Sequence, residues 1–337
     1  MLRNQQDMIL VTGASGFIGS AIIWALNLQG IDNIIACDSL ESSDKYKNLI
    51  PLRFADYWEY DQLQENILHG GAGLNCVTHI FHMGACSSTT ETNNRYLIKN
   101  NYQYTQKLAH WALAKGARFI YASSAATYGD GREGMDDREE SIEQLRPLNM
   151  YGYSKHLFDL YAKRQGWLDK IIGLKYFNVY GPNEGHKGSM RSLVNKAFYQ
   201  IRETQKVQLF KSYNPEYRHG EQKRDFLYVK DAVAMTLHLA NSNSASGLFN
   251  IGSGKAHTWI ELVNALFSAM ELEPQVEFID MPESIKSKYQ YYTCAKIEKL
   301  KENGYAKSLY SLKNAVCDYV KNYLLEDKNL SSNHLRD

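Results

Sequence analysis

Three glycines constrain the fold of this chain more than any other feature. Gly13, Gly16 and Gly19 stand between a short apolar run at 8–11 and a stretch with helical apolar spacing at 17–28. In a strand–turn–helix unit, such glycines allow a tight turn, close approach of the main chain to a pyrophosphate, and close packing of the helix on the sheet. The helix N-terminus then offers N–H groups to the phosphates. The glycines therefore predict a dinucleotide-binding βαβ unit.

Strand-like and helix-like segments alternate through the first half of the chain. Strands are expected at 33–37, 78–83, 118–122 and 171–176, and helices at 104–114 and 151–165. Strands separated by helices predict a parallel sheet covered on both faces. We expect an α/β fold with a Rossmann-type, doubly wound parallel sheet at 1–177. A smaller mixed α/β substrate-binding lobe is expected at 178–337, interleaved with the end of the sheet.

The second half has fewer periodic signals. Two helices are expected there, at 231–240 and 258–270, and the polar tail from Glu326 is expected to be frayed.

Composition narrows the class of protein. The net charge of +1 over 337 residues argues against a nucleic-acid-binding surface. No apolar run approaches the ~20 residues that span a bilayer, and the polar start lacks the apolar core of a signal peptide. The five cysteines include no close pair, and the histidines show no metal-ligand spacing. We therefore expect a reduced, cytoplasmic enzyme without a metal or a membrane partner.

Asp38 closes the second predicted strand, where an acidic residue meets the adenosine ribose of a dinucleotide. Its carboxylate favours NAD, because it repels a 2′-phosphate. Ser39 and Lys45 follow closely, however, and a hydroxyl and an ammonium suit the 2′-phosphate of NADP. The residues alone leave both dinucleotides open.

Tyr151 and Lys155 stand four residues apart, on one face of a predicted helix. A free phenol, with a pKa near ~10, is a poor base, but an ammonium and a positive nicotinamide ring both favour phenolate. Tyr151 can then take a proton from an alcohol while hydride leaves. Ser124 follows an apolar strand, where ligands of open α/β sheets bind, and can hydrogen-bond the reacting oxygen. An isolated Tyr/Lys pair is also typical of an ordinary helix, so the prediction depends on the order of these three features.

The chain resembles the extended short-chain dehydrogenase/reductases that act on nucleotide sugars, and among them the ADP-L-glycero-D-manno-heptose 6-epimerase family. The resemblance runs from about 8 to 323, and its segments are 11–20, 84–91, 100–104, 121–129 and 176–190. Residues 84–91 and 184–190 discriminate this family, whereas the rest is shared with many nucleotide-sugar epimerases. The resemblance implies inversion of C6 in ADP-heptose, for lipopolysaccharide core synthesis, by a cytoplasmic homo-oligomer (a pentamer) of a Gram-negative bacterium with tightly held NADP.

The chemistry of C6 inversion explains which catalytic groups the reaction requires. An unactivated carbinol has no acidic C–H, so inversion needs oxidation to a 6-keto intermediate and return of hydride to the opposite face. Rotation of the exocyclic group moves the carbonyl oxygen, and two acid/base groups are then the economical solution. By resemblance these are Tyr151 and Lys187, supported by Ser124 and Lys155. A phosphate contact or a solvated loop lysine is the alternative for Lys187.

The resemblance also implies binding residues. For the cofactor they are Gly13, Gly16, Phe17, Ile18, Gly19, Asp38, Ser39, Lys45, Arg53, Met83, Gly84, Ala85, Cys86, Ser87, Asn100, Lys155, Val179 and Lys187. For the substrate they are Asn178, Ser189, Phe210, Lys211, Ser212, Arg224 and Tyr289. The planar fork of Arg224 suits a diphosphate, and a buried pair with Asp225 is a comparable alternative. Tyr289 could equally be core. The chain departs from the family pattern at Met83, where a glutamate is expected, in a longer segment at 213–222, and in an extension at 1–7.

Two further functions compete with this one. Another nucleotide-sugar epimerase or dehydratase shares most of the motifs, but a dehydratase needs an acidic residue after the active-site serine, where Ala125 and Ala126 stand. A non-catalytic NADP-binding sensor usually lacks the tyrosine or the lysine, and this chain keeps both.

Overall fold

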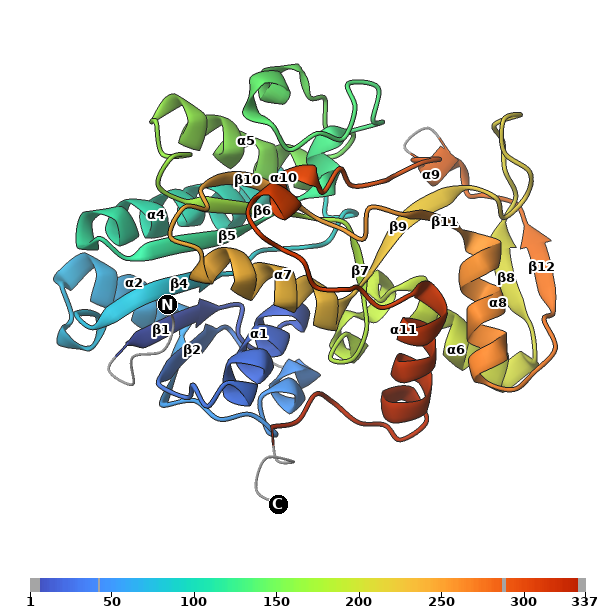
Figure 1. The fold of residues 1–337 in the computed structure, drawn as a ribbon, viewed down its shortest axis with the longest axis horizontal. Coiled ribbons are helices and arrows are strands. Elements are labelled where there is room, and N and C mark those ends of the chain that lie inside the picture. The colour runs from blue at the N-terminus through green and yellow to red at the C-terminus, as the bar shows by residue number, and fades with distance from the viewer. Residues whose placement is uncertain (1–6, 42, 287–288, 333–337) are drawn as a thin grey trace.

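A large parallel sheet forms the centre of the computed structural model, which describes residues 7–41, 43–286 and 289–332 (Figure 1). All pairs of neighbouring strands in it are parallel. In spatial order the strands are β10 (Gly247–Ile251), β6 (Ile172–Tyr176), β5 (Arg118–Ser124), β4 (Val77–His82), β1 (Met8–Thr12), β2 (Ile34–Asp38) and β3 (Asp56–Glu59). The expected α/β fold with a doubly wound sheet is thereby confirmed.

Helices cover both faces of this sheet, because successive strand residues point to opposite sides. Ile9 and Val11 of β1 pack in one buried cluster and Leu10 packs in the other. One face carries α1 (Phe17–Leu28) and α7 (Val229–Asn241). The other carries α2 (Tyr60–His69), α4 (Tyr104–Lys115) and α5 (Met150–Arg164), with α3 (Asn94–Leu97) and the π-helix η3 (Ile98–Gln103) leading into α4.

A smaller lobe lies beside the carboxyl ends of the strands (Figure 1, right). Its three-stranded sheet has β11 (Ala256–Thr258), β9 (Lys223–Tyr228) and β7 (Asn178–Tyr180), and its two-stranded sheet has β12 (Val276–Ile279) and β8 (Val207–Phe210). Its helices are α6 (Leu193–Thr204), α8 (Trp259–Ala269), α9 (Glu283–Lys286) and α11 (Leu312–Tyr319). The short helix α10 (Glu298–Glu302) instead lies beside β10 of the large sheet (Figure 1). Short 3-10 and π segments complete the chain: η1 (Asp44–Asn48), η2 (Ala72–Leu74), η4 (Ala125–Tyr128), η5 (Glu139–Gln144), η6 (Gly185–Met190) and η7 (Val320–Leu324).

The chain crosses between the lobes more than once, since α7 and β10 return to the large sheet after β7, α6, β8 and β9. The division at 177 and 178 stays a prediction. The helix α6 was not among the helices expected in the second half of the chain. Ser192 caps this helix by accepting from the backbone N–H of Asn195 at 3.2 Å, and its buried residues recur at helical spacing.

The expected fraying of the tail was wrong for residues 326–332. Leu330 is fully buried, and its N–H donates to the side-chain oxygen of Asn183 at 2.9 Å. The hydroxyl of Ser332 donates to the carbonyl of Pro51 at 2.9 Å. Six of the seven residues of the predicted extension, 1–6, lie outside the described residues.

Within 7–41, 43–286 and 289–332, no helix is long and apolar enough to cross a bilayer. The same residues contain no group of three or more His, Cys, Asp or Glu side chains that could hold a metal ion.

Candidate active site

A cavity of about 890 Å³ opens at the carboxyl ends of β1, β4, β5 and β6, and residues of both lobes line it. Open α/β sheets bind their ligands at this edge. Most of the predicted site residues line it: Gly13, Gly16, Phe17, Ile18, Gly19, Asp38, Lys45, Met83, Gly84, Ala85, Ser87, Ser124, Tyr151, Lys155, Asn178, Val179, Lys187, Phe210 and Tyr289. The fold therefore brings the two predicted acid/base groups and the glycines into one cavity.

The glycine loop (residues 13–19) has the geometry that a pyrophosphate requires. Gly13 has a φ of +66°, and a Cβ there would lie 2.6 Å from the backbone nitrogen of Gly84. A Cβ on Gly19 would lie 2.1 Å from the carbonyl oxygen of Gly13. No side chain of the described chain caps α1 after Gly16, and its first turn holds no acidic residue. The free N–H groups and the positive end of α1 thus face a cradle that side chains would fill.

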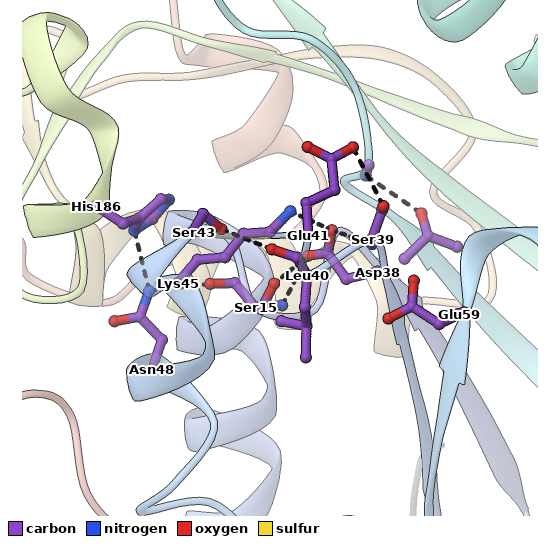
Figure 2. A network of polar contacts seen from close by, with 12 residues as sticks. Ser15, Asp38, Ser39, Leu40, Glu41, Ser43, Lys45, Asn48, Glu59 and His186 are labelled. Carbon is purple, nitrogen blue, oxygen red and sulfur yellow. Dashed lines mark hydrogen bonds and ion pairs between the residues drawn. The ribbon is translucent and has the colours of Figure 1, made fainter.

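The carboxylate of Asp38 lies at the centre of a polar network beside this loop (Figure 2). One oxygen accepts from the backbone N–H and the hydroxyl of Ser15, at 2.9 and 2.5 Å. The other accepts from the N–H of Ser39 at 2.8 Å and from the ammonium of Lys45 at 2.9 Å. Four donors use the four lone-pair positions that a carboxylate offers. Lys45 also compensates the charge of Asp38.

Tyr151 and Ser124 meet because α5 packs closely on the turn after β5. Asn149 caps α5 by accepting from the N–H of Gly152 at 2.8 Å, and a Cβ on Gly152 would lie 2.7 Å from the carbonyl of Ala126. Burial raises the pKa of Tyr151, and a hydrogen bond from Ser124 partly opposes that effect. The phenol is therefore held neutral here, with its hydrogen-bonded oxygen at the cavity.

Lys155 lies one turn further along α5 and is buried. Its ammonium donates to the carbonyl oxygen of Ala122 in β5 at 2.7 Å. Burial lowers the pKa of Lys155 to about 8, and the nearby carboxylate of Asp159 acts in the opposite direction. The hydrogen bond that opposes the effect of burial on the pKa of Tyr151 comes from Ser124. The support of Tyr151 by Lys155 stays a prediction.

Lys187 reaches the same cavity from η6. Its ammonium nitrogen lies 5.2 Å from the ring centroid of Phe17, a glycine-loop residue. Burial lowers the pKa of Lys187, while the carboxylate of Glu184 raises it and the ammonium of Lys196 lowers it further. The amine of Lys187, which is half-buried, therefore releases its proton more readily than a fully exposed lysine does.

The smaller lobe contributes aromatic walls. Tyr289 and Trp259 line the cavity, and the indole N–H donates to the Tyr289 hydroxyl at 2.9 Å. The guanidinium of Arg224 lies behind them, 5.1 Å from the Tyr289 ring and 5.6 Å from the Trp259 ring, and donates to the carbonyls of Lys223 and Gln290. Asp225 instead accepts from Ser253, Gly254 and Ala295, so the alternative of a buried Arg224–Asp225 pair does not hold.

Several predicted contacts stand outside the described lining: Ser39, Arg53, Cys86, Asn100, Ser189, Lys211, Ser212 and Arg224. Arg53 is the clearest correction. Its guanidinium donates to the carbonyl of Asn27 at the far end of α1 and lies 3.7 Å from the carboxylate of Asp32, which precedes β2. Both partners belong to the edge of the sheet opposite the glycine loop. Arg53 was assigned by resemblance alone, and no residue pattern supported it.

Asn101, which follows the predicted contact Asn100, holds the loop at residues 83–87 in place. Asn101 is fully buried, accepts from the N–H of Cys86 at 2.8 Å and donates to its carbonyl at 2.9 Å.

Two predicted substrate contacts have other partners in the smaller lobe. Lys211 pairs with Asp280 at 3.2 Å, and the Ser212 hydroxyl donates to the carbonyl of Asn214 at 3.0 Å.

Two cations of the lining, Lys196 and Arg191, went unnoticed in the sequence. Lys196 lies one turn into α6, and burial and the charge of Arg191 lower its pKa. The serine cap at 192 with apolar residues at 194, 197, 198 and 201 was the signal that could have revealed α6 and thereby these cations.

Comparisons with known proteins agree with this geometry. The model of the "NAD dependent epimerase/dehydratase family" matches residues 9–252. A protein of Nitratidesulfovibrio vulgaris (strain DP4), named ADP-L-glycero-D-manno-heptose-6-epimerase, is 49% identical over 94% of this chain and 98% of its own length. One of the same name from Fusobacterium nucleatum is 44% identical over 95% and 99%. The crystal structure of the Helicobacter pylori ADP-L-glycero-D-manno-heptose-6-epimerase matches with a TM-score of 0.77 and 27% identity, over 95% of this chain and 98% of that one.

Proposed function

Since the chain belongs to the NAD dependent epimerase/dehydratase family, we propose that it converts ADP-D-glycero-D-manno-heptose into ADP-L-glycero-D-manno-heptose by inverting C6. One observation carries the proposal beyond the names of the relatives. Tyr151 of α5 and Lys187 of η6 come from separate parts of the chain, yet both line the cavity that the glycine loop borders. An inversion through a rotating ketone needs two such groups. The product would serve lipopolysaccharide inner-core synthesis.

The chain's own groups handle the proton. A dinucleotide held against the glycine loop would supply the hydride chemistry at C6. Burial raises the pKa of Tyr151 and lowers the pKa of Lys187, so the phenol holds its proton more firmly and the amine releases its proton more readily than when exposed. Tyr151 and Lys187 are the proposed acid/base pair. One removes the C6 hydroxyl proton, the other protonates the oxygen after the exocyclic group has turned, and exchange with solvent restores both. Ser124 hydrogen-bonds the reacting oxygen.

NADP is the proposed dinucleotide. The four acceptor positions of Asp38 are used by Ser15, Ser39 and Lys45, so a ribose hydroxyl would have to displace one of these donors. Lys45 also offsets the charge by which a carboxylate repels a 2′-phosphate. The dinucleotide that co-purifies with the protein tests this directly, and recovery of NAD alone would contradict it. Lys45→Ala should weaken NADP binding more than NAD binding.

The reaction is tested with purified protein and one C6 epimer, without added cofactor, in deuterium oxide. Interconversion should occur, and C6 should keep its original hydrogen because the hydride never exchanges with solvent. Deuterium at C6 would indicate deprotonation instead. Absence of interconversion by protein that retains its dinucleotide would refute the proposed activity.

The remaining predictions concern the competing functions, the oligomeric state and the cellular location. Ala125 and Ala126 offer no acid for a dehydratase, and the described residues keep both Tyr151 and Lys155, which a non-catalytic sensor would not need. Homo-oligomerisation, reported as pentameric for the family, and a cytoplasmic location stay predictions, which sedimentation of the pure protein and cell fractionation can test.

A further inference from the structure

A buried side-chain amide joins the glycine loop to the segment that carries Lys187 (Figure 2). Asn48 ends η1 and is 4% exposed. Its amide nitrogen donates to the carbonyl oxygens of Ser15 and Asn183, both at 3.0 Å, and lies 3.2 Å from Nδ1 of His186. Ser15 belongs to the glycine loop, whereas Asn183 and His186 precede Lys187. One side chain thus bridges the glycine loop, 33 positions before Asn48, and a segment 135 positions after it.

The Lys187 segment (residues 181–192) is held at defined points rather than by regular structure. Asn183 has a φ of +76°, and its amide donates to the Ser20 hydroxyl at 3.0 Å. The buried carboxylate of Glu184 accepts from the N–H of Gly181 at 3.2 Å and from the hydroxyl of Ser192 at 2.7 Å. These bonds anchor both ends of the segment.

Lys187 lies three residues after Glu184 and is attached to it. Its backbone N–H donates to the carbonyl of Glu184 at 3.0 Å, and its ammonium lies over the ring of Phe17 in the glycine loop. The side chain therefore spans from the anchored segment toward the glycine loop, which Asn48 holds through Ser15. A shift between the two segments would move the amine relative to a ligand in the cavity.

We infer that Asn48 is a positioning residue for Lys187, which fixes the Lys187 segment against the glycine loop so that the amine reaches the reacting oxygen. This inference rests on the proposed function, since it presumes the acid/base role of Lys187. Asn48 itself acts only through its partners and exchanges no proton. Burial and the charges of Lys187 and Lys45 lower the pKa of His186 to about 4, so its ring is neutral and the bridge keeps one form at neutral pH.

Asn48→Ala tests the inference, and Asn27→Ala is its matched control. Asn27 is equally buried and bridges backbone in the same way, donating to the carbonyls of Ile31 and Arg53 at 2.9 and 2.8 Å, but at the opposite edge of the sheet. Both variants should lower the melting temperature. Asn48→Ala alone should lower kcat, by about tenfold, with KM and dinucleotide content unchanged, because small displacements of a reacting group are costly. Equal kcat values in the two variants would overturn the inference.

A double-mutant cycle with Lys187→Ala separates positioning from a general loss of structure. If Asn48 acts through Lys187, its removal should change kcat by less than about twofold once Lys187 is gone. The same loss in both backgrounds would overturn the inference, and so would a loss that added dinucleotide restores. Full turnover by Lys187→Ala alone would instead refute the proposed role of Lys187. If Asn48→Ala does not fold, Asn48→Ser keeps a donor at the site and enters the same cycle.

Discussion

Tyr151 and Lys187 line one cavity, but the chain supports them in different ways. Tyr151 lies in the first turn of α5, a helix of 15 residues that packs on the large sheet. Lys187 stands in η6, a segment of six residues in which Gly188 leaves the helical conformation with a φ of +54°. Apolar packing fixes the first group, whereas a few polar bonds of Asn48, Asn183 and Glu184 fix the second.

The helix side also contains a buried charged cluster beneath Lys155. The carboxylate of Asp159 accepts from the hydroxyls of Tyr121 and Ser123 and from the ammonium of Lys175, each at 2.8 Å. Both members of the ion pair are at most 1% exposed. The cluster ties β5, α5 and β6 together. We therefore expect a regular, well-packed element to tolerate the loss of one contact better than a segment whose position depends on individual hydrogen bonds.

The largest expected effect comes from removing the hydroxyl of Tyr151, the proposed acid/base group on α5. Tyr151→Phe should lower kcat by about 10³-fold, because it removes the proton that the phenol transfers. The melting temperature and dinucleotide content should stay unchanged, since the ring still fills its place. Turnover within a few fold of the unmodified protein would show that Tyr151 has no acid/base role.

Lys187→Ala should lower kcat by about 10²-fold with little change in KM. The effect is expected to be smaller than for Tyr151 because none of the described residues of η6 is buried, so water can reach the place of the amine and carry the proton instead. Steady-state kinetics at saturating substrate measure it. A raised KM with unchanged kcat would assign Lys187 to phosphate binding, the alternative that the sequence left open.

Asp159→Asn should destabilise the protein by about 3–5 kcal/mol, because it leaves the ammonium of Lys175 buried without its partner. Denaturant unfolding at pH 7 measures the change. Glu271→Gln is the control, since it removes an exposed pair with Lys321 and should have no measurable effect. Similar midpoints for both variants would show that the cluster contributes little to holding α5.

The smallest expected effect concerns the stability of the folded protein at low pH, to which His82 of β4 contributes. His82 lies between the hydroxyls of Thr12 and Thr105, at 2.7 and 2.9 Å, and burial lowers its pKa to about 3. Between pH 6.5 and about 3 the unfolded chain binds the proton and the folded chain does not, so stability is complete above pH 6.5 and falls as the pH drops. The loss is at most about 1.4 kcal/mol per pH unit.

The pH dependence is best measured as a difference. Burial raises the pKa of Asp137 and Asp231 to about 6, and these carboxyls favour the folded state toward lower pH in the window from about 4 to 6. His82→Gln leaves that opposing contribution in place. The free energy of unfolding of the variant should therefore fall less on acidification than that of the unmodified protein, and parallel curves would contradict the assignment.

The sequence allowed the helix side to be predicted because its signals are local and periodic. Glycine spacing, alternating strands and helices, and a tyrosine four residues before a lysine all follow from backbone geometry. The loop side depends on contacts between distant residues, such as Asn48 with Asn183, which no short pattern encodes. Arg53 shows the limit of resemblance alone, since its position depends on Asn27, 26 residues away.

The contact between Leu330 and Asn183 has a consequence for protein synthesis. The two residues are 147 positions apart, so the ribosome must add all of that chain before the bond that fixes Asn183 can form. At about 5–20 residues per second, this takes roughly 7 to 30 seconds. The sheet and the helix with Tyr151 can fold during that interval, whereas the bond from Leu330 to Asn183 forms last among the contacts that hold the Lys187 segment. We therefore expect the proposed dinucleotide site of a nascent chain to form before the contact of Leu330 with Asn183.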